Sequence, residues 1–318
     1  MVARMDALTR PNTGLGPNYE TRHRGAGFGL AVVGLMVVAV TLVANIVAGN
    51  LLDSDPLSAS QTLAWSFGFT TLGFGTIKLA IAVVLIGILV RLWLRVEAVK
   101  ATLPLLKADG GDASAAIGDV TTPYGRAVAG RVAPGSLPIH RMARTMWAPM
   151  LAMGAMALVA GTVLSVIWAA RIDGGSASTV ADLSAWTQGL QFLGEGMLLA
   201  GIGFLLGSIL ASLREGGGQV QEAVGVTVTT LKMPTTAKVF VGLMMLGLMV
   251  AVAQFVLYLV ATGADSAQSF AAWQAWLGPF RELGLGLILA GIVMALVTIG
   301  NVLGFQFDRI RQIIVTGR

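Results

Sequence analysis

The chain has 318 residues, of which 55% are hydrophobic and 12% are charged, and its formal net charge is +5. Soluble globular domains carry about 25% charged residues, so this composition excludes an ordinary soluble domain and predicts a membrane protein. The chain contains no cysteine and only two histidines, His23 and His140. That count excludes disulfides, iron–sulfur clusters and a three-histidine zinc site within one chain, and we expect no cofactor.

The first apolar run follows a polar, basic segment, residues 1–26. It is longer than the roughly 7 to 15 residues of a signal-peptide core, and no convincing small-residue cleavage site follows it. We therefore expect it to be retained as the first membrane span.

Six apolar stretches are long enough to cross a membrane, since about 20 helical residues span a hydrocarbon core of about 30 Å. Helices are the expected spanning element because their backbone groups are satisfied within the segment, and period-two alternation is absent. The predicted spans are residues 27–49, 73–94, 147–170, 189–213, 239–262 and 284–305.

Consecutive spans are expected to pair as helical hairpins. The fold class predicted is therefore an all-α integral membrane protein with six helices in three tandem hairpins. The expected segments are an N-terminal segment (1–26), hairpin 1 (27–94), an amphipathic and then Gly- and Pro-rich connection (95–146), hairpin 2 (147–213), a loop (214–238), hairpin 3 (239–305) and a tail (306–318).

The basic residues predict the orientation of the chain. Eighteen of the 21 lysines and arginines lie in the two terminal segments, the 91–146 region and the 214–238 loop. The other three loops are assigned only Arg171 and Arg281, against six acidic residues. Because cytoplasmic loops are enriched in Lys and Arg, we expect a protein of the cytoplasmic (inner) membrane with both termini inside. This also explains the basic balance without nucleic acid as a partner.

A repeated pattern, AWxxxxxxLGxG, occurs once in each hairpin, as "AWSFGFTTLGFG" (64–75), "AWTQGLQFLGEG" (185–196) and "AWLGPFRELGLG" (275–286). Three ungapped matches at the same place in successive hairpins predict an internal repeat and a pseudo-threefold bundle. The tryptophans are expected at the water interface, where each outer loop ends, and the glycines at close helix contacts. The tryptophans are Trp65, Trp186 and Trp276, and the glycines are Gly73, Gly75, Gly194, Gly196, Gly284 and Gly286.

Two charged residues, Lys78 and Glu195, fall inside predicted spans. Aligning the repeats places them about one helical turn apart in depth, in the outer third of the membrane. Side chains lean toward the N-terminus of their helix, so Lys78 is expected to lean toward the level of Glu195 and to form an ion pair with it. This pair is either structural or part of a transport or ligand site, because an ionisable residue inside a membrane suggests function by default.

Other polar residues fall near the same depth and predict a polar layer that opens outward. They are Asn45, Ser165, Gln254 and Tyr258. A methionine cluster also follows helical spacing at the inner end of the third span. Thioethers can bind Cu(I), but methionine also fills gaps between small residues, and without cysteine we predict no metal site here. The cluster is Met146, Met150, Met153 and Met156.

No paired acid and base, metal set or nucleophile arrangement is present, so we expect no enzyme activity. Two functions remain open. The first is a non-catalytic membrane subunit or scaffold that packs with itself, as a homo-oligomer, or with other membrane proteins in the lipid bilayer. The second is a small-solute permease or channel with a polar outer vestibule around Lys78 and Glu195. The inner halves of the spans have few polar groups, with Asn301 the main exception, whereas a conduit needs them across its whole depth, so the first is favoured.

Overall fold

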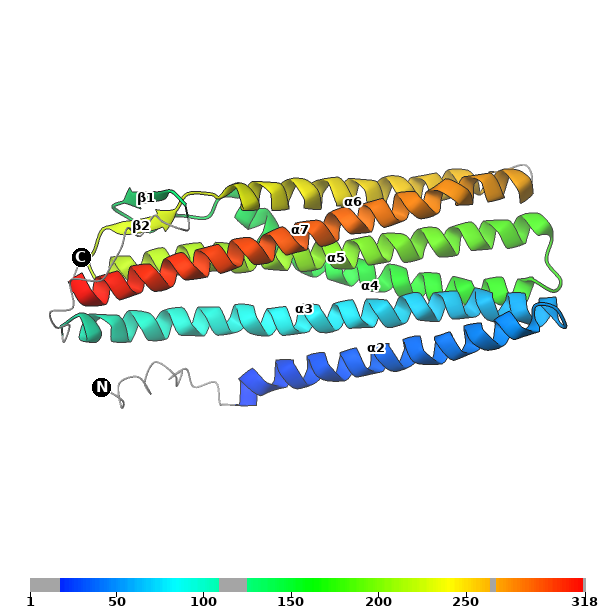
Figure 1. The fold of residues 1–318 in the computed structure, drawn as a ribbon, viewed down its shortest axis with the longest axis horizontal. Coiled ribbons are helices and arrows are strands. Elements are labelled where there is room, and N and C mark those ends of the chain that lie inside the picture. Colours follow the sequence, from blue (N-terminus) through cyan, green and yellow to red (C-terminus); the bar gives the residue numbers. More distant parts are fainter. Residues whose placement is uncertain (1–17, 109–124, 264–266, 317–318) are drawn as a thin grey trace.

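The computed structural model describes residues 18–108, 125–263 and 267–316. In these ranges six long helices run alongside one another (Figure 1), and each is long and apolar enough to cross a membrane. The predicted all-helical architecture with six such helices is confirmed. The helices are α2 (Asn18–Leu51), α3 (Pro56–Ala108), α4 (Pro138–Arg171), α5 (Ala177–Ala223), α6 (Thr235–Ala261) and α7 (Ala267–Thr316).

The second helix of each hairpin is much longer than its predicted span, with 53 residues in α3, 47 in α5 and 50 in α7. Local caps explain where two of them begin. Asp55 accepts hydrogen bonds from the backbone N and Oγ of Ser58, and Ser176 Oγ accepts one from the backbone N of Thr179. Such side chains satisfy the unpaired N–H groups of a first turn.

These early helix starts correct two predictions about the outer loops. Trp65, Trp186 and Trp276 do not end loops but lie inside α3, α5 and α7. Arg281, assigned to an outer loop from the sequence, lies inside α7 as well. The physical reason is that hydropathy marks only the stretch that suits lipid, whereas a capped helix continues beyond it.

Helix α5 lies in the middle of the bundle, packed against α3, α4, α6 and α7 (Figure 1). Its leucines, including Leu198, Leu205 and Leu206, form the centre of the main hydrophobic core. Helix α2 packs along α3 and is the least buried of the six spans. Between α2 and α7 the described residues make no extensive contact, although α3 and α7 touch, and threefold symmetry is not shown.

Each hairpin contains one very close glycine contact between its two helices. A Cβ added to the glycine on the first helix would lie only 2.6 to 3.0 Å from the carbonyl oxygen of a glycine on the second. The second glycine is in every case the first glycine of an LGxG segment. The contacts join Gly34 to Gly73, Gly154 to Gly194, and Gly247 to Gly284. Such contacts are typical of membrane helices, which associate through close packing of small residues.

A short antiparallel ribbon at one end of the bundle was not predicted. Strand β1 (Ala127–Gly130) pairs with β2 (Val228–Leu231), which joins the two long connections to each other. Gln221 near the end of α5 binds the backbone of β2, donating to Thr229 O and accepting from Thr229 N, both at 2.8 Å. The buried Arg309 of α7 donates to Gln221 at 3.0 Å and so ties α7 to the same place.

Candidate functional site

Glu195 forms the centre of an ion triad inside the bundle. Its side chain is almost fully buried, with 4% of the residue exposed. Lys78 Nζ of α3 donates to Glu195 Oε1 at 2.8 Å, and Arg281 Nη2 of α7 donates to Oε2 at 3.0 Å. The structure thus brings the two predicted residues into contact and adds Arg281, which the sequence reasoning had placed in a loop.

Each residue of the triad comes from a different hairpin. Because α5 lies between α3 and α7, both oxygens of one carboxylate are used to connect the first and third hairpins to the second. Removing one partner of a buried ion pair leaves an uncompensated charge, which is strongly destabilising. The triad can therefore lock the arrangement of the hairpins.

An aromatic ring supports the position of Arg281. The guanidinium carbon lies 3.7 Å from the centroid of the Phe192 ring, on α5 one turn before Glu195. A cation over an aromatic face is attracted by the electrons of the ring, more strongly where water is excluded. Glu282, the next acid along the chain, is 3.8 Å from Arg281 Nη1 but largely exposed. Inside the bundle, two cations therefore face one buried carboxylate.

Polar side chains without partners lie close to the triad on α5. Gln191 is fully buried against Gly68 of α3 and Gly161 of α4. In the described part of the chain neither its Nε2 nor its Oε1 has a hydrogen-bond partner, and neither has the buried Thr187 Oγ1. A buried amide without partners is costly, so Gln191 marks a place where a polar group is favoured. Sequence reasoning did not single it out.

The four residues of the predicted outer polar layer lie on α2, α4 and α6. Asn45 accepts a hydrogen bond from Ser66 within the first hairpin, and Ser165 donates to a carbonyl of its own helix. Gln254 and Tyr258 lie on α6, and Tyr258 donates to Gln188 of α5 at 3.2 Å. Asn45 and Ser165 are thus bonded within their own hairpins, whereas Gln254 and Tyr258 interact with each other, and Tyr258 also packs against Phe192 beside the triad.

The tryptophans and the glycines of the repeat lie in different surroundings. Trp65 is half-buried, whereas Trp186 and Trp276 are 42% and 43% exposed. The first glycines of the LGxG segments form the contacts within hairpins described above. Of the second glycines, Gly75 packs on Leu158 and Gly196 on Ala251, in each case on the next hairpin.

The predicted methionine cluster is not assembled into one site. Met150 is buried, whereas Met153 and Met156 are exposed on the helix surface, with Met156 63% exposed. Among residues 18–108, 125–263 and 267–316 no group of three His, Cys, Asp or Glu side chains lies together. Met146 is half-buried nearer the start of α4.

The triad can thus hold helices together or bind a charged group by electrostatic attraction. It does not place a nucleophile beside a base. Its two cations and one carboxylate can stabilise a helix arrangement or attract a polar or anionic group, and Gln191 can add hydrogen bonds. Comparison of the chain with protein-family models, with curated proteins and with solved structures finds no match in any of the three.

Proposed function

We propose that the protein is a non-catalytic, multi-pass subunit of the cytoplasmic membrane that associates with a second copy of itself. The observation that carries this proposal is the surface around Gly286 on α7. A Cβ at this glycine would meet no atom within 4 Å among the described residues, although its counterparts in the other hairpins are tightly packed. The proposed orientation, with both termini inside, is supported by the distribution of basic residues.

We infer that the hairpins are repeats of one another, and the contacts within them support this. In each hairpin the first glycine of LGxG meets a glycine on the preceding helix. The second glycine then packs against the first helix of the following hairpin. Gly75 packs on Leu158 of α4 in this way, and Gly196 packs on Ala251 of α6. At Gly286 no described residue takes the corresponding place, so this packing position is an open seat.

The first helix of another copy suits the open seat. In the repeat alignment Leu158 and Ala251 correspond to Val38 of α2, which lies four residues after Gly34 just as they follow Gly154 and Gly247. Helix α2 is the least buried span, and among the described residues its extensive packing is along α3. A contact from α7 of one copy to α2 of another continues the pattern already present twice within each chain. Such a head-to-tail contact generates a ring or a longer array.

Disulfide trapping tests this arrangement directly because the chain has no cysteine. Copies carrying Gly286→Cys are co-expressed with copies carrying Val38→Cys, and membranes are oxidised. We expect a disulfide-linked dimer, since such bonds form only where the two Cα atoms approach within about 7 Å. Gly242→Cys on α6 is the matched control, as this glycine is also exposed with no atom nearby. Equal trapping with Gly242→Cys would contradict the proposal. A chain that carries both Gly286→Cys and Val38→Cys gives a further check, because a disulfide formed only within single chains would also contradict it.

A second candidate function, a small-solute permease or channel with a polar outer vestibule, is favoured by Gln191 and the excess cation of the triad. The test is uptake by liposomes, measured for small anions and small neutral solutes with purified protein. If Gln191 lines a route, Gln191→Leu abolishes uptake while Gln219→Leu, at an exposed position on the same helix, leaves it unchanged. If the unmodified protein supports no uptake above that of empty liposomes, the permease function is excluded for those solutes.

A further inference from the structure

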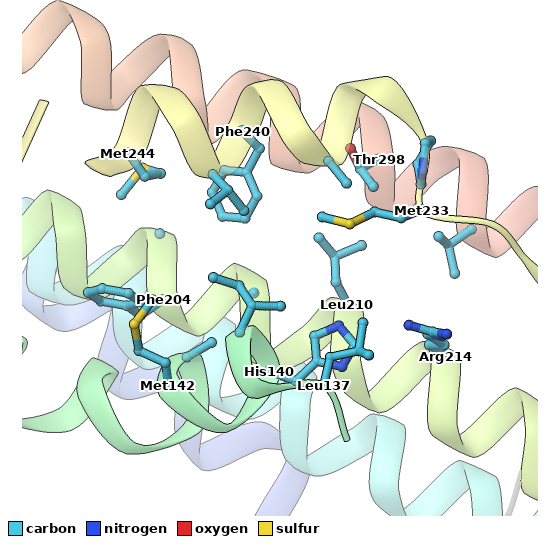
Figure 2. A pocket seen from close by; sticks show the side chains of 18 of the residues that line it. Leu137, His140, Met142, Phe204, Leu210, Arg214, Met233, Phe240, Met244 and Thr298 are labelled. Carbon is cyan, nitrogen blue, oxygen red and sulfur yellow. The ribbon is translucent and has the colours of Figure 1, made fainter. Parts of the chain in front are cut away.

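A cavity of about 110 Å³ lies at the end of the bundle that carries the β ribbon, between the starts of α4 and α6. Helix α5 forms its floor, and α7 and the segment around β2 complete the wall. A single water needs roughly 10 to 15 Å³ of such space, so the cavity holds a group much larger than water. Its walls are mainly apolar, and Phe204, Leu210, Phe240 and Met244 supply much of them (Figure 2).

The cavity has one cationic end. Figure 2 shows Arg214 at the side of Met233, at the opposite end from Met244 and Phe204. Arg214 forms no hydrogen bond or ion pair with any residue the structure describes, and its Nε is buried without a partner. The nearest acid in sequence, Glu215, is already held by Arg144 at 2.7 Å and by Ser136 at 2.8 Å. The guanidinium of Arg214 is therefore available for an anion.

The ring of His140 faces the same cavity, and its Nδ1 is also buried without a partner within the described ranges. This nitrogen adds a second polar atom to the end where Arg214 lies (Figure 2). The pair suits a group with several acceptor oxygens, since guanidinium binds phosphate oxygens in a forked geometry.

The cavity opens sideways rather than toward the bundle centre. Helices α4 and α6 both pack on α5 but make no extensive contact with each other in the described residues. Met233 and Met245, which line the cavity, are 40% and 42% exposed and lie at this opening. In a spanning helix bundle this side faces lipid. An acyl chain can therefore enter from the bilayer without crossing a polar surface.

We propose that this cavity binds an anionic phospholipid of the surrounding membrane, with one acyl chain in the apolar part and the headgroup phosphate against Arg214. The apolar walls and the unpaired cation border one cavity, so a lipid tail and its phosphate can be bound together. Flexible methionines such as Met244 and Met245 can adapt to an acyl chain. This site is independent of the self-association proposed above, because it involves neither α2 nor Gly286.

Lipid titration followed by native mass spectrometry tests the site with the full-length protein in a neutral detergent. The probes are phosphatidylglycerol, phosphatidylcholine with the same chains, and inorganic phosphate. We expect phosphatidylglycerol to bind more tightly than phosphatidylcholine and phosphate alone not to compete. Arg214→Gln should raise the dissociation constant for phosphatidylglycerol by roughly tenfold, because a charge-assisted contact is lost. Arg141→Gln, which removes an exposed cation from the same helix end as His140, should leave it unchanged.

A second variant probes the part of the site that is proposed to hold the acyl chain. Val241→Trp places a large side chain in the cavity wall and should weaken binding of both phospholipids while leaving the protein monodisperse. Three results would overturn the proposal: equal affinity for the two phospholipids, competition by inorganic phosphate, or unchanged binding in Val241→Trp. An equal loss of affinity for phosphatidylglycerol in Arg141→Gln and Arg214→Gln would also overturn the proposal. If Arg214→Gln fails to fold, the comparison of the two lipids in the unmodified protein and in Val241→Trp still decides.

Discussion

Glu195 lies between two cations that come from the hairpins on either side of its own. A charged carboxylate inside a membrane costs free energy, and here an ion pair at each of its two oxygens offsets that cost. An exposed pair would contribute little, but the 5% side-chain exposure of Glu195 shields it from competing water. The triad is thus a residue-scale feature with an effect on the arrangement of helices.

Replacing Glu195 by Gln should lower the free energy of unfolding by about 2 kcal/mol. This exceeds the average of about 0.6 kcal/mol for hydrogen bonds between membrane helices, because two ion pairs end at one carboxylate. It is less than the 3 to 5 kcal/mol of fully buried pairs, since Lys78 and Arg281 keep side-chain exposures of 18% and 23%. Thermal unfolding in detergent measures it.

Glu222→Gln, at an exposed position on the same helix, is the matched control and should change the midpoint little. Adding Lys78→Met to Glu195→Gln should cost less than the two single changes together, because both disrupt one contact. Additive effects, or a Glu195→Gln protein as stable as the control, would show that the triad does not hold the hairpins.

Sequence reasoning predicted two members of this triad and missed the third for a definite reason. Lys78 and Glu195 were found because they interrupt apolar spans. Arg281 was assigned to an outer loop, since its span was thought to begin at Gly284, whereas α7 begins at Ala267. The repeat alignment contained the missing signal. Arg281 corresponds to Gln191 in the second copy, one helical turn outward from the level of Glu195.

At the scale of elements, the number and type of the spans were predictable but their lengths were not. Hydropathy reports where a helix suits lipid, and it does not mark where α3, α5 and α7 continue beyond their apolar stretches. The β ribbon was missed for a different reason. Its strands have four residues each, with the weakly patterned sequences "AVAG" and "VTTL", and they pair across about a hundred residues of chain. Only the folded bundle brings them together.

Gln221 should control the attachment of this ribbon to the bundle. Gln221→Leu removes both hydrogen bonds to the backbone of Thr229 and the acceptor of Arg309 Nε, while Arg309 keeps its bonds to Gln312 and Thr227. We expect a loss of about 2 kcal/mol, within the range for unsatisfied buried polar groups. Hydrogen exchange should show faster exchange at the backbone amides of β2.

Gln219→Leu provides a control of the same chemistry two residues away, since Gln219 is exposed. It should leave exchange in β2 unchanged. If Gln221→Leu leaves β2 as protected as before, the side chain does not hold the ribbon, and strand pairing with β1 is sufficient.

At the scale of the whole molecule, the six helices place the ends of the hairpins at two opposite faces of the bundle. The turn between α4 and α5 lies at one face, and the β ribbon lies at the other (Figure 1). From the distribution of basic residues we propose that the ribbon face is cytoplasmic. The fold alone leaves this orientation open, because a helix bundle is equally stable either way up.

Cysteine labelling in intact cells tests the orientation. Gly174→Cys lies in the exposed turn after α4, and Lys232→Cys lies at an exposed position after β2. A membrane-impermeant maleimide should label Gly174→Cys in intact cells and Lys232→Cys only after permeabilisation. The absence of native cysteine makes the unmodified protein a blank control. The reverse labelling pattern would show that the termini face outward.

The central place of α5 has a consequence for how the protein is made. Synthesis proceeds from the N-terminus, so α5 enters the membrane before α6 and α7, which later cover one of its sides. Until the last hairpin is inserted, Lys78 balances the charge of Glu195, but Glu195 Oε2 lacks the hydrogen bond that Arg281 later donates. A chain that stops before Arg281 therefore exposes a carboxylate oxygen that the completed molecule covers and satisfies.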